Sequence, residues 1–86
     1  MAKLIPAAER LIRARKLIQQ ARALPVPQGG LGKSDFSYIA HVKDLLRQAR
    51  DMVKFIPQTA GVSAEMKEEV RKVFEEADQA NREILY

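Results

Sequence analysis

The chain of 86 residues suffices for one small domain, and its composition, 47% apolar and 30% charged, is typical of a folded protein rather than a disordered one. It contains no cysteine, which excludes disulfides and thiolate zinc sites, and its one histidine, His41, offers little for an imidazole metal site. No apolar run approaches the roughly 18 residues that a membrane span needs. We therefore expect a single cytoplasmic domain, residues 1–86, with no metal and no cofactor.

The formal net charge of +4 is unevenly distributed along this basic protein. Residues 1–60 hold 11 Lys and Arg against 4 Asp and Glu, whereas residues 61–86 hold 4 against 7. This asymmetry suits either a polyanionic partner or attraction between the two parts of the fold.

The first helix is expected at residues 4–23, with Pro6 in its first turn and Pro25 disfavouring helical geometry just beyond it. Apolar residues recur at heptad spacing, with alanine alternating with larger side chains: Leu4, Ala7, Leu11, Ala14, Ile18 and Ala21. The alanines predict close approach of another helix. An arginine-rich, acid-poor N-terminus is also typical of a mitochondrial presequence, but the regular stripe and the absence of Ser and Thr before Ser34 favour a core helix.

The segment PVPQGGLGK, residues 25–33, holds two prolines and three glycines and predicts a loop. With Ser34 it is similar to the variant phosphate loop KGG-x-GK-[ST] of nucleotide-binding ATPases, with Gln28 in place of the first lysine. A phosphate loop needs a preceding strand, and no stretch of the chain shows the period of two that predicts one. We expect a loop followed by a helix cap, with weak anion binding at the helix N-terminus left open.

The second helix is expected at residues 35–56, capped by Ser34 or Asp35 and ended by Pro57. Its broad apolar stripe comprises Ile39, Val42, Leu46, Ala49, Val53 and Ile56, widened by Tyr38, Leu45 and Met52. Another face carries the candidate nucleic-acid or partner face: Lys43, Arg47, Arg50 and Lys54. The first helix would extend this face, if it lies alongside, through three further basic residues: Arg10, Arg13 and Lys16.

The third helix is expected at residues 63–85, with Ser63 as its N-cap. Its apolar stripe comprises Met66, Val70, Val73, Ala77, Ala80 and Ile84. Pairs four residues apart, Glu68 with Lys72 and Asp78 with Arg82, are expected to link its exposed side chains. Its many acids lack the Glu-x-x-His signature of a metal-binding bundle, so we assign them to an outer face.

The short second loop forces the second and third helices to run antiparallel, and the longer first loop permits the same for the first and second. The sequence therefore predicts an all-α, up-down-up three-helix bundle with coiled-coil-like packing. The first and third helices then run parallel. On the heptad count, one flank of the third helix is acidic and one flank of the first is basic, so these flanks meet if the bundle turns the right way. The residues concerned are Glu69, Glu76 and Glu83 on one side, and Arg15 and Arg22 on the other.

Three aromatic residues, Phe36, Phe55 and Tyr86, fall outside the apolar stripes and are candidate interface residues. With a core this small, they favour self-association into a helical homo-oligomer, most simply a dimer. The sequence thus predicts a non-enzymatic protein–protein interaction or regulatory module with no membrane partner. The alternative is sequence-nonspecific nucleic-acid binding through the basic face. A nucleotide-binding function centred on Lys33 and Ser34 is the least favoured.

Overall fold

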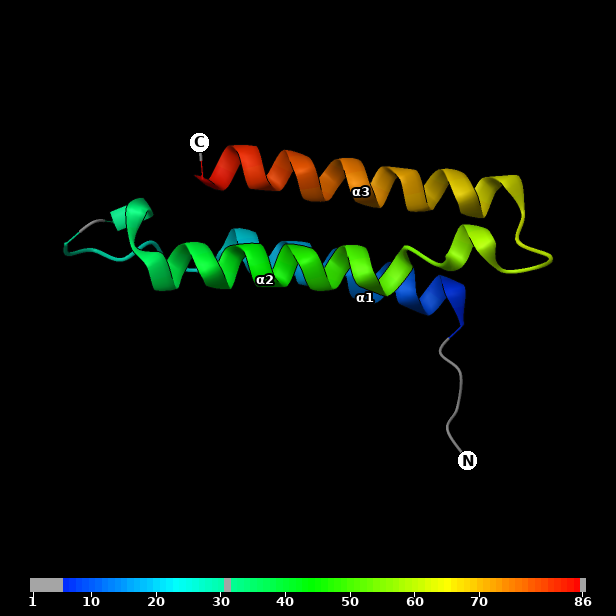
Figure 1. Ribbon diagram of the computed structural model, residues 1–86, viewed down its shortest axis with the longest axis horizontal. Coiled ribbons are helices and arrows are strands. Elements are labelled where there is room, and N and C mark those ends of the chain that lie inside the picture. Colours follow the sequence, from blue (N-terminus) through cyan, green and yellow to red (C-terminus); the bar gives the residue numbers. More distant parts are fainter. Residues whose placement is uncertain (1–5, 31, 86) are drawn as a thin grey trace, which may run out of the picture.

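Three α-helices form an up-down-up bundle in the computed structural model, which describes residues 6–30 and 32–85 (Figure 1). They are α1 (Ala7–Ala23), α2 (Phe36–Val53) and α3 (Ala64–Leu85). Short 3-10 helices, η1 (Gly32–Ser34) and η2 (Ile56–Gln58), lie in the two connections. The bundle measures 50 × 30 × 16 Å, and the described residues contain no strand, so the predicted fold is confirmed.

Side-chain caps start the second and third helices where the sequence predicts them. The Asp35 carboxylate accepts a hydrogen bond from the Tyr38 amide at 3.0 Å, and the Ser63 hydroxyl accepts one from the Met66 amide at 3.1 Å. Each cap satisfies a backbone N–H that has no partner within its helix. The starts of α2 and α3 are therefore defined by local chemistry.

Two helix ends differ from the prediction. Helix α1 begins at Ala7, because Pro6 has extended backbone geometry and occupies the N-cap position; Leu4 and Ile5 lie outside the described residues. Helix α2 ends at Val53 and not at Ile56, since Pro57 disfavours α-helical geometry at the residue before it. The chain tightens into η2 there, which keeps the Ile56 side chain in the core at 1% exposure.

A single apolar core joins the three helices. It is made of Leu11, Ala14, Ile18, Ala21, Tyr38, Val42, Leu45, Leu46, Ala49, Val53, Ile56, Val70, Val73, Ala77 and Ala80. Among these, the alanines Ala14, Ala21 and Ala49 have no exposed surface, and α1 and α2 make the most extensive contact of any two helices. The margins of the predicted stripes, including Met52, are only partly buried. Ile12 of α1 lies outside this core and is 49% exposed.

Ion pairs connect the parallel helices α1 and α3 along one flank. Arg15 pairs with two glutamates, Glu69 at 2.8 Å through Nη2 and Glu76 at 3.2 Å through Nε. Seven residues further along α1, Arg22 pairs with Glu83. The hydrogen bond from Arg15 is the main cause that lowers the pKa of Glu69. The predicted meeting of the acidic and basic flanks is confirmed.

The two pairs expected within α3 do not form. Glu68 bonds to Arg71, three residues away, because the guanidinium group of Arg71 forks to both Glu68 and Glu75. Lys72 instead lies 3.4 Å from Glu69. Asp78, expected to pair with Arg82, faces α2.

Replacing a buried isoleucine of α1 tests the core. We expect Ile18→Ala, at 3% exposure, to lower the free energy of unfolding by about 2–5 kcal/mol, because it removes buried methyl groups and leaves a cavity. The same change at the exposed Ile12 should stay within about 0.5 kcal/mol. Urea denaturation followed by circular dichroism measures both, and equal losses at the two sites would contradict the assigned core.

The α1–α3 flank should make stability depend on pH. The pKa values of Glu69 and Glu83 are lowered in the folded state, Glu83 first by a bond from Gln79 and then by Arg22. Their stabilisation is therefore complete above the ordinary glutamate value of about 4.3 and is lost as the pH falls through the lower folded values. We expect the Tm of the wild type to fall more steeply between neutral pH and pH ~3 than that of an Arg15→Met/Arg22→Met variant. Parallel Tm curves would contradict this role.

Candidate partner-binding face

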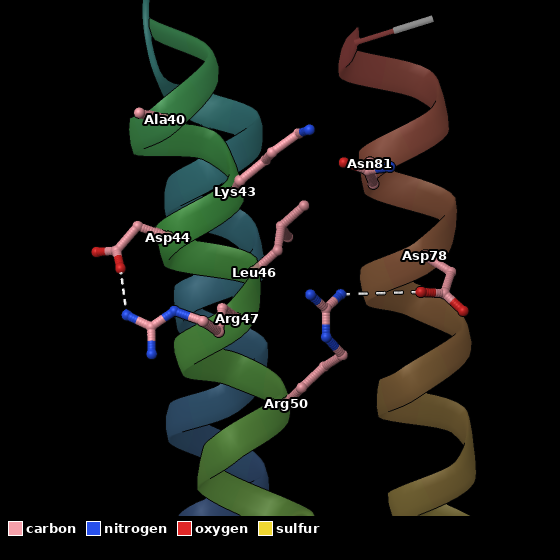
Figure 2. Close-up of a pocket in the computed structure, with 8 residues that line it drawn as sticks. All are labelled: Ala40, Lys43, Asp44, Leu46, Arg47, Arg50, Asp78 and Asn81. Carbon is pink, nitrogen blue, oxygen red and sulfur yellow. Dashed lines mark hydrogen bonds and ion pairs between the residues drawn. The ribbon is translucent and has the colours of Figure 1, made fainter. Parts of the chain in front are cut away.

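A groove lies between α2 and α3, along the basic face predicted on α2. Its volume is about 600 Å³, and its walls are formed by Ala40, Lys43, Asp44, Leu46, Arg47, Arg50, Asp78 and Asn81. Figure 2 shows Lys43, Leu46 and Arg50 pointing from α2 toward α3, whereas Arg47 turns back to Asp44. Leu46, only 1% exposed, closes the floor. We call this surface the α2–α3 groove.

Two of the four predicted basic residues are paired along their own helix. Arg47 lies 2.5 Å from Asp44 and 3.4 Å from Asp51, and Lys54 lies 3.1 Å from the same Asp51. The hydrogen bond from Arg47 is the main cause that lowers the pKa of Asp44. These short-range pairs neutralise much of the positive charge at the outer rim of the face.

The other two basic residues keep most of their hydrogen-bonding capacity. Arg50 approaches one carboxylate, that of Asp78 on α3, at 3.8 Å, which is too long for a hydrogen bond (Figure 2). Lys43 has no ion-pair partner among residues 6–30 and 32–85, and in Figure 2 it extends toward Asn81. The groove therefore offers two cationic side chains to a ligand.

Two of the three α1 residues expected to extend this face, Arg13 and Lys16, do not extend it. Arg13 and Lys16 line a separate groove of about 260 Å³ with Gln48 and Met52. Side chains share a helix face when they are three, four or seven residues apart. Gln48 and Met52 follow Lys43 by five and nine residues, so they lie on the opposite flank of α2. The expected continuous basic patch is thus wrong, and α2 separates the two clusters.

Two of the candidate interface aromatics are exposed, and they lie at opposite ends of α2. Phe36, the first residue of the helix, is 81% exposed, and Phe55, just after its end, is 59% exposed. The Nζ atom of Lys54 lies 5.0 Å from the centre of the Phe55 ring, within cation–π distance. Tyr86, the third candidate, lies outside the described residues. Phe36 and Phe55 are thus about 28 Å apart along the helix and are two separate exposed aromatic sites rather than one patch.

Sequence reasoning missed the α3 side of the groove. Asp78 was assigned with the other acids of the third helix to an outer face, and Asn81 was not singled out, yet both line the groove opposite Lys43 and Arg50. The available signal is their position three residues apart on the flank of α3 that also carries the half-buried Phe74. That flank is opposite the glutamates that pair with α1.

The glycine-rich loop lacks the setting of a phosphate loop in the described part of the chain. Gly30 and Gly32 adopt φ values of 60° and 54°, a conformation that favours glycine. The element before the loop is helix α1, whereas a phosphate loop follows a strand, and the loop ends in η1. The Asp35 carboxylate occupies the start of α2, where an anion would otherwise meet free N–H groups. His41 is exposed and borders a small hollow with Pro25, Pro27 and Tyr38.

The described residues contain neither a metal-binding cluster nor a membrane-spanning helix. No group of three or more His, Asp or Glu side chains among them is placed to hold a metal ion. None of the helices in this part of the chain is long and apolar enough to cross a membrane.

The sequence matches no protein-family model, and neither a curated protein nor a solved structure matches the chain.

The weak Arg50–Asp78 contact leads to a stability prediction. We expect Arg50→Ala to lower the free energy of unfolding by no more than about 1 kcal/mol, because a long, half-exposed ion pair contributes little. Urea denaturation measures this, with Leu46→Ala, in the floor of the same groove, as the destabilising comparison at about 2–5 kcal/mol. A loss at Arg50 equal to that at Leu46 would show that the arginine serves the fold.

Proposed function

We propose that this protein is a non-enzymatic protein–protein interaction module that self-associates, most simply as a dimer. The observation that carries the proposal is the exposure of Phe36 at 81% and Phe55 at 59% on a chain with a small core. Large aromatic side chains on an otherwise charged surface are the usual anchors of protein interfaces. Their burial against a second chain would add to the limited apolar surface that an 86-residue bundle removes from water.

The absence of a catalytic role is part of the proposal. The α2–α3 groove and a second surface hollow, formed by Arg22, Lys72, Glu75, Glu76 and Gln79, are lined mainly by charged side chains. His41 has no ion-pair or hydrogen-bond partner among these residues that would orient it as a general base. We also propose a cytoplasmic location, which a sequence without cysteine suits.

Sequence-nonspecific nucleic-acid binding is the second candidate. It draws on the basic face of α2, where Lys43 has no ion-pair partner in the described part of the chain. It ranks second because Arg47 and Lys54 are paired with Asp44 and Asp51, so few cations are free to contact phosphates. Binding of labelled duplex near 50 mM salt that weakens steeply as salt is raised would support it.

Self-association is tested by sedimentation velocity over a micromolar concentration series. We expect the wild type to associate, and Phe36→Ser or Phe55→Ser to raise the dimer dissociation constant at least about tenfold, because each removes an aromatic anchor. Val26→Ser is the matched control, since Val26 is an exposed apolar residue (41%) in the first loop. A wild type that remains monomeric at every concentration contradicts the proposal.

A further inference from the structure

The bundle itself shows how a basic helix flank binds an acidic helix. Arg15 and Arg22, seven residues apart on α1, form ion pairs with three glutamates spaced seven residues apart on the parallel helix α3. The glutamates are Glu69, Glu76 and Glu83. Heptad-spaced charges meet in this way because residues seven apart return to the same side of a packed helix.

Helix α2 carries the same spacing without a matching acidic helix. Phe36, Lys43 and Arg50 follow one another at intervals of seven residues, which places them on the same side of α2. Lys43 and Arg50 line the α2–α3 groove. The acid nearest to them across the groove is Asp78, 3.8 Å from Arg50, while Lys43 has no ion-pair partner in the described ranges 6–30 and 32–85. The basic flank of α2 thus has the charge spacing of the α1 flank but lacks a facing row of glutamates like the one that α3 presents to α1.

Arg50 can accept a further carboxylate without losing Asp78. Arg15 binds two glutamates at once, one through Nη2 and one through Nε. A guanidinium group has five N–H donors, and the guanidinium group of Arg50 makes no hydrogen bond to any described residue, its one ion-pair contact being Asp78 at 3.8 Å. Its side chain is 35% exposed, so these donors are accessible from the groove.

We propose that the α2–α3 groove binds an acidic amphipathic helix of a partner protein. Two carboxylates of that helix, seven residues apart, pair with Lys43 and Arg50. An apolar residue seven positions before the carboxylate that pairs with Lys43 packs on Phe36. The proposal rests on the proposed interaction function and names the chemistry of one partner. It adds a fourth helix to the bundle in the groove-docking mode that amphipathic helices commonly use.

The acids must come from another protein, because this chain has no free set at the required spacing. Its glutamates on one flank of α3 are bound to α1. The two other acidic pairs seven residues apart each share an arginine: Glu68 and Glu75 share Arg71, and Asp44 and Asp51 share Arg47. Nucleic acid fits less well than a helix. Asp44 and Asp78 lie in the groove wall, where they repel a continuous row of phosphates but leave room between discrete carboxylates.

The test uses a labelled synthetic amphipathic helix with one leucine followed by two glutamates at intervals of seven residues. Its control replaces both glutamates by glutamine. Fluorescence anisotropy at low salt should show the glutamate peptide binding at least about tenfold more tightly to the wild-type protein, because the paired charges are lost in the control.

Matched protein variants locate the binding site. Lys43→Glu should weaken binding of the glutamate peptide by about tenfold or more, through repulsion in the groove. Lys16→Glu makes the same change in net charge at an exposed residue of α1, across α2 from the groove. It should leave the dissociation constant of the glutamate peptide within about twofold of the wild-type value. Circular dichroism shows whether both variants fold, and Lys43→Gln, which introduces no repulsion, should weaken binding to an intermediate degree.

Several results would overturn the inference. Equal binding of the two peptides, or equal effects of Lys43→Glu and Lys16→Glu, would show that the groove does not select heptad-spaced acids. Tighter binding of duplex DNA than of the glutamate peptide, lost in Lys43→Glu, would assign the flank to nucleic acid. A protein that self-associates but does not distinguish the peptides loses the inference and keeps the proposed function. A monomeric protein that binds the glutamate peptide through Lys43 keeps the inference and loses self-association.

Discussion

The close contact of α1 with α2 is the constraint on which the rest of the bundle depends. Alanines at Ala14, Ala21 and Ala49 have no exposed surface and allow the two backbones to approach. A seam this narrow leaves one long side open, and α3 covers it with small side chains of its own, including Val73 and Ala77. Once α3 lies over the seam, one of its flanks must border α1 and the other must border α2.

The uneven charge of the chain acquires a structural meaning from this arrangement. The acidic third helix is held against the basic first helix by the Arg15 and Arg22 pairs, so part of the asymmetry serves attraction within the fold. The basic flank of α2 meets fewer acids, because the α3 flank beside it contributes Asp78 and Asn81 to the groove wall. The cationic character that remains is concentrated at Lys43 and Arg50.

Much of the fold could be predicted from heptad phase. The phase specifies which residues are buried. For parallel helices it also specifies which flanks meet in one of the two ways of turning the bundle, so the pairing of Arg15 with Glu69 could be predicted on that condition. Caps were equally predictable, because Asp35 and Ser63 act within three residues of their own positions.

The groove could not be predicted, because the heptad pattern is the same for both ways of turning the bundle. Only the three-dimensional arrangement decides that α3, and not α1, borders the basic flank of α2, and this brings Asp78 to Arg50. The heptad pattern also does not specify which charged neighbours pair along a single helix. Glu68 has cations both three and four residues away, and side-chain geometry selects Arg71.

An odd number of antiparallel helices has a consequence for the path of the chain. Helix α1 starts at one end of the 50 Å rod and α3 finishes at the other (Figure 1). A circular permutant would need a linker that runs back over the whole length of a helix, on the order of ten extended residues. Tandem copies need no such return, since one copy ends where the next can begin, and a fused concatemer would grow as a line of rods placed head to tail.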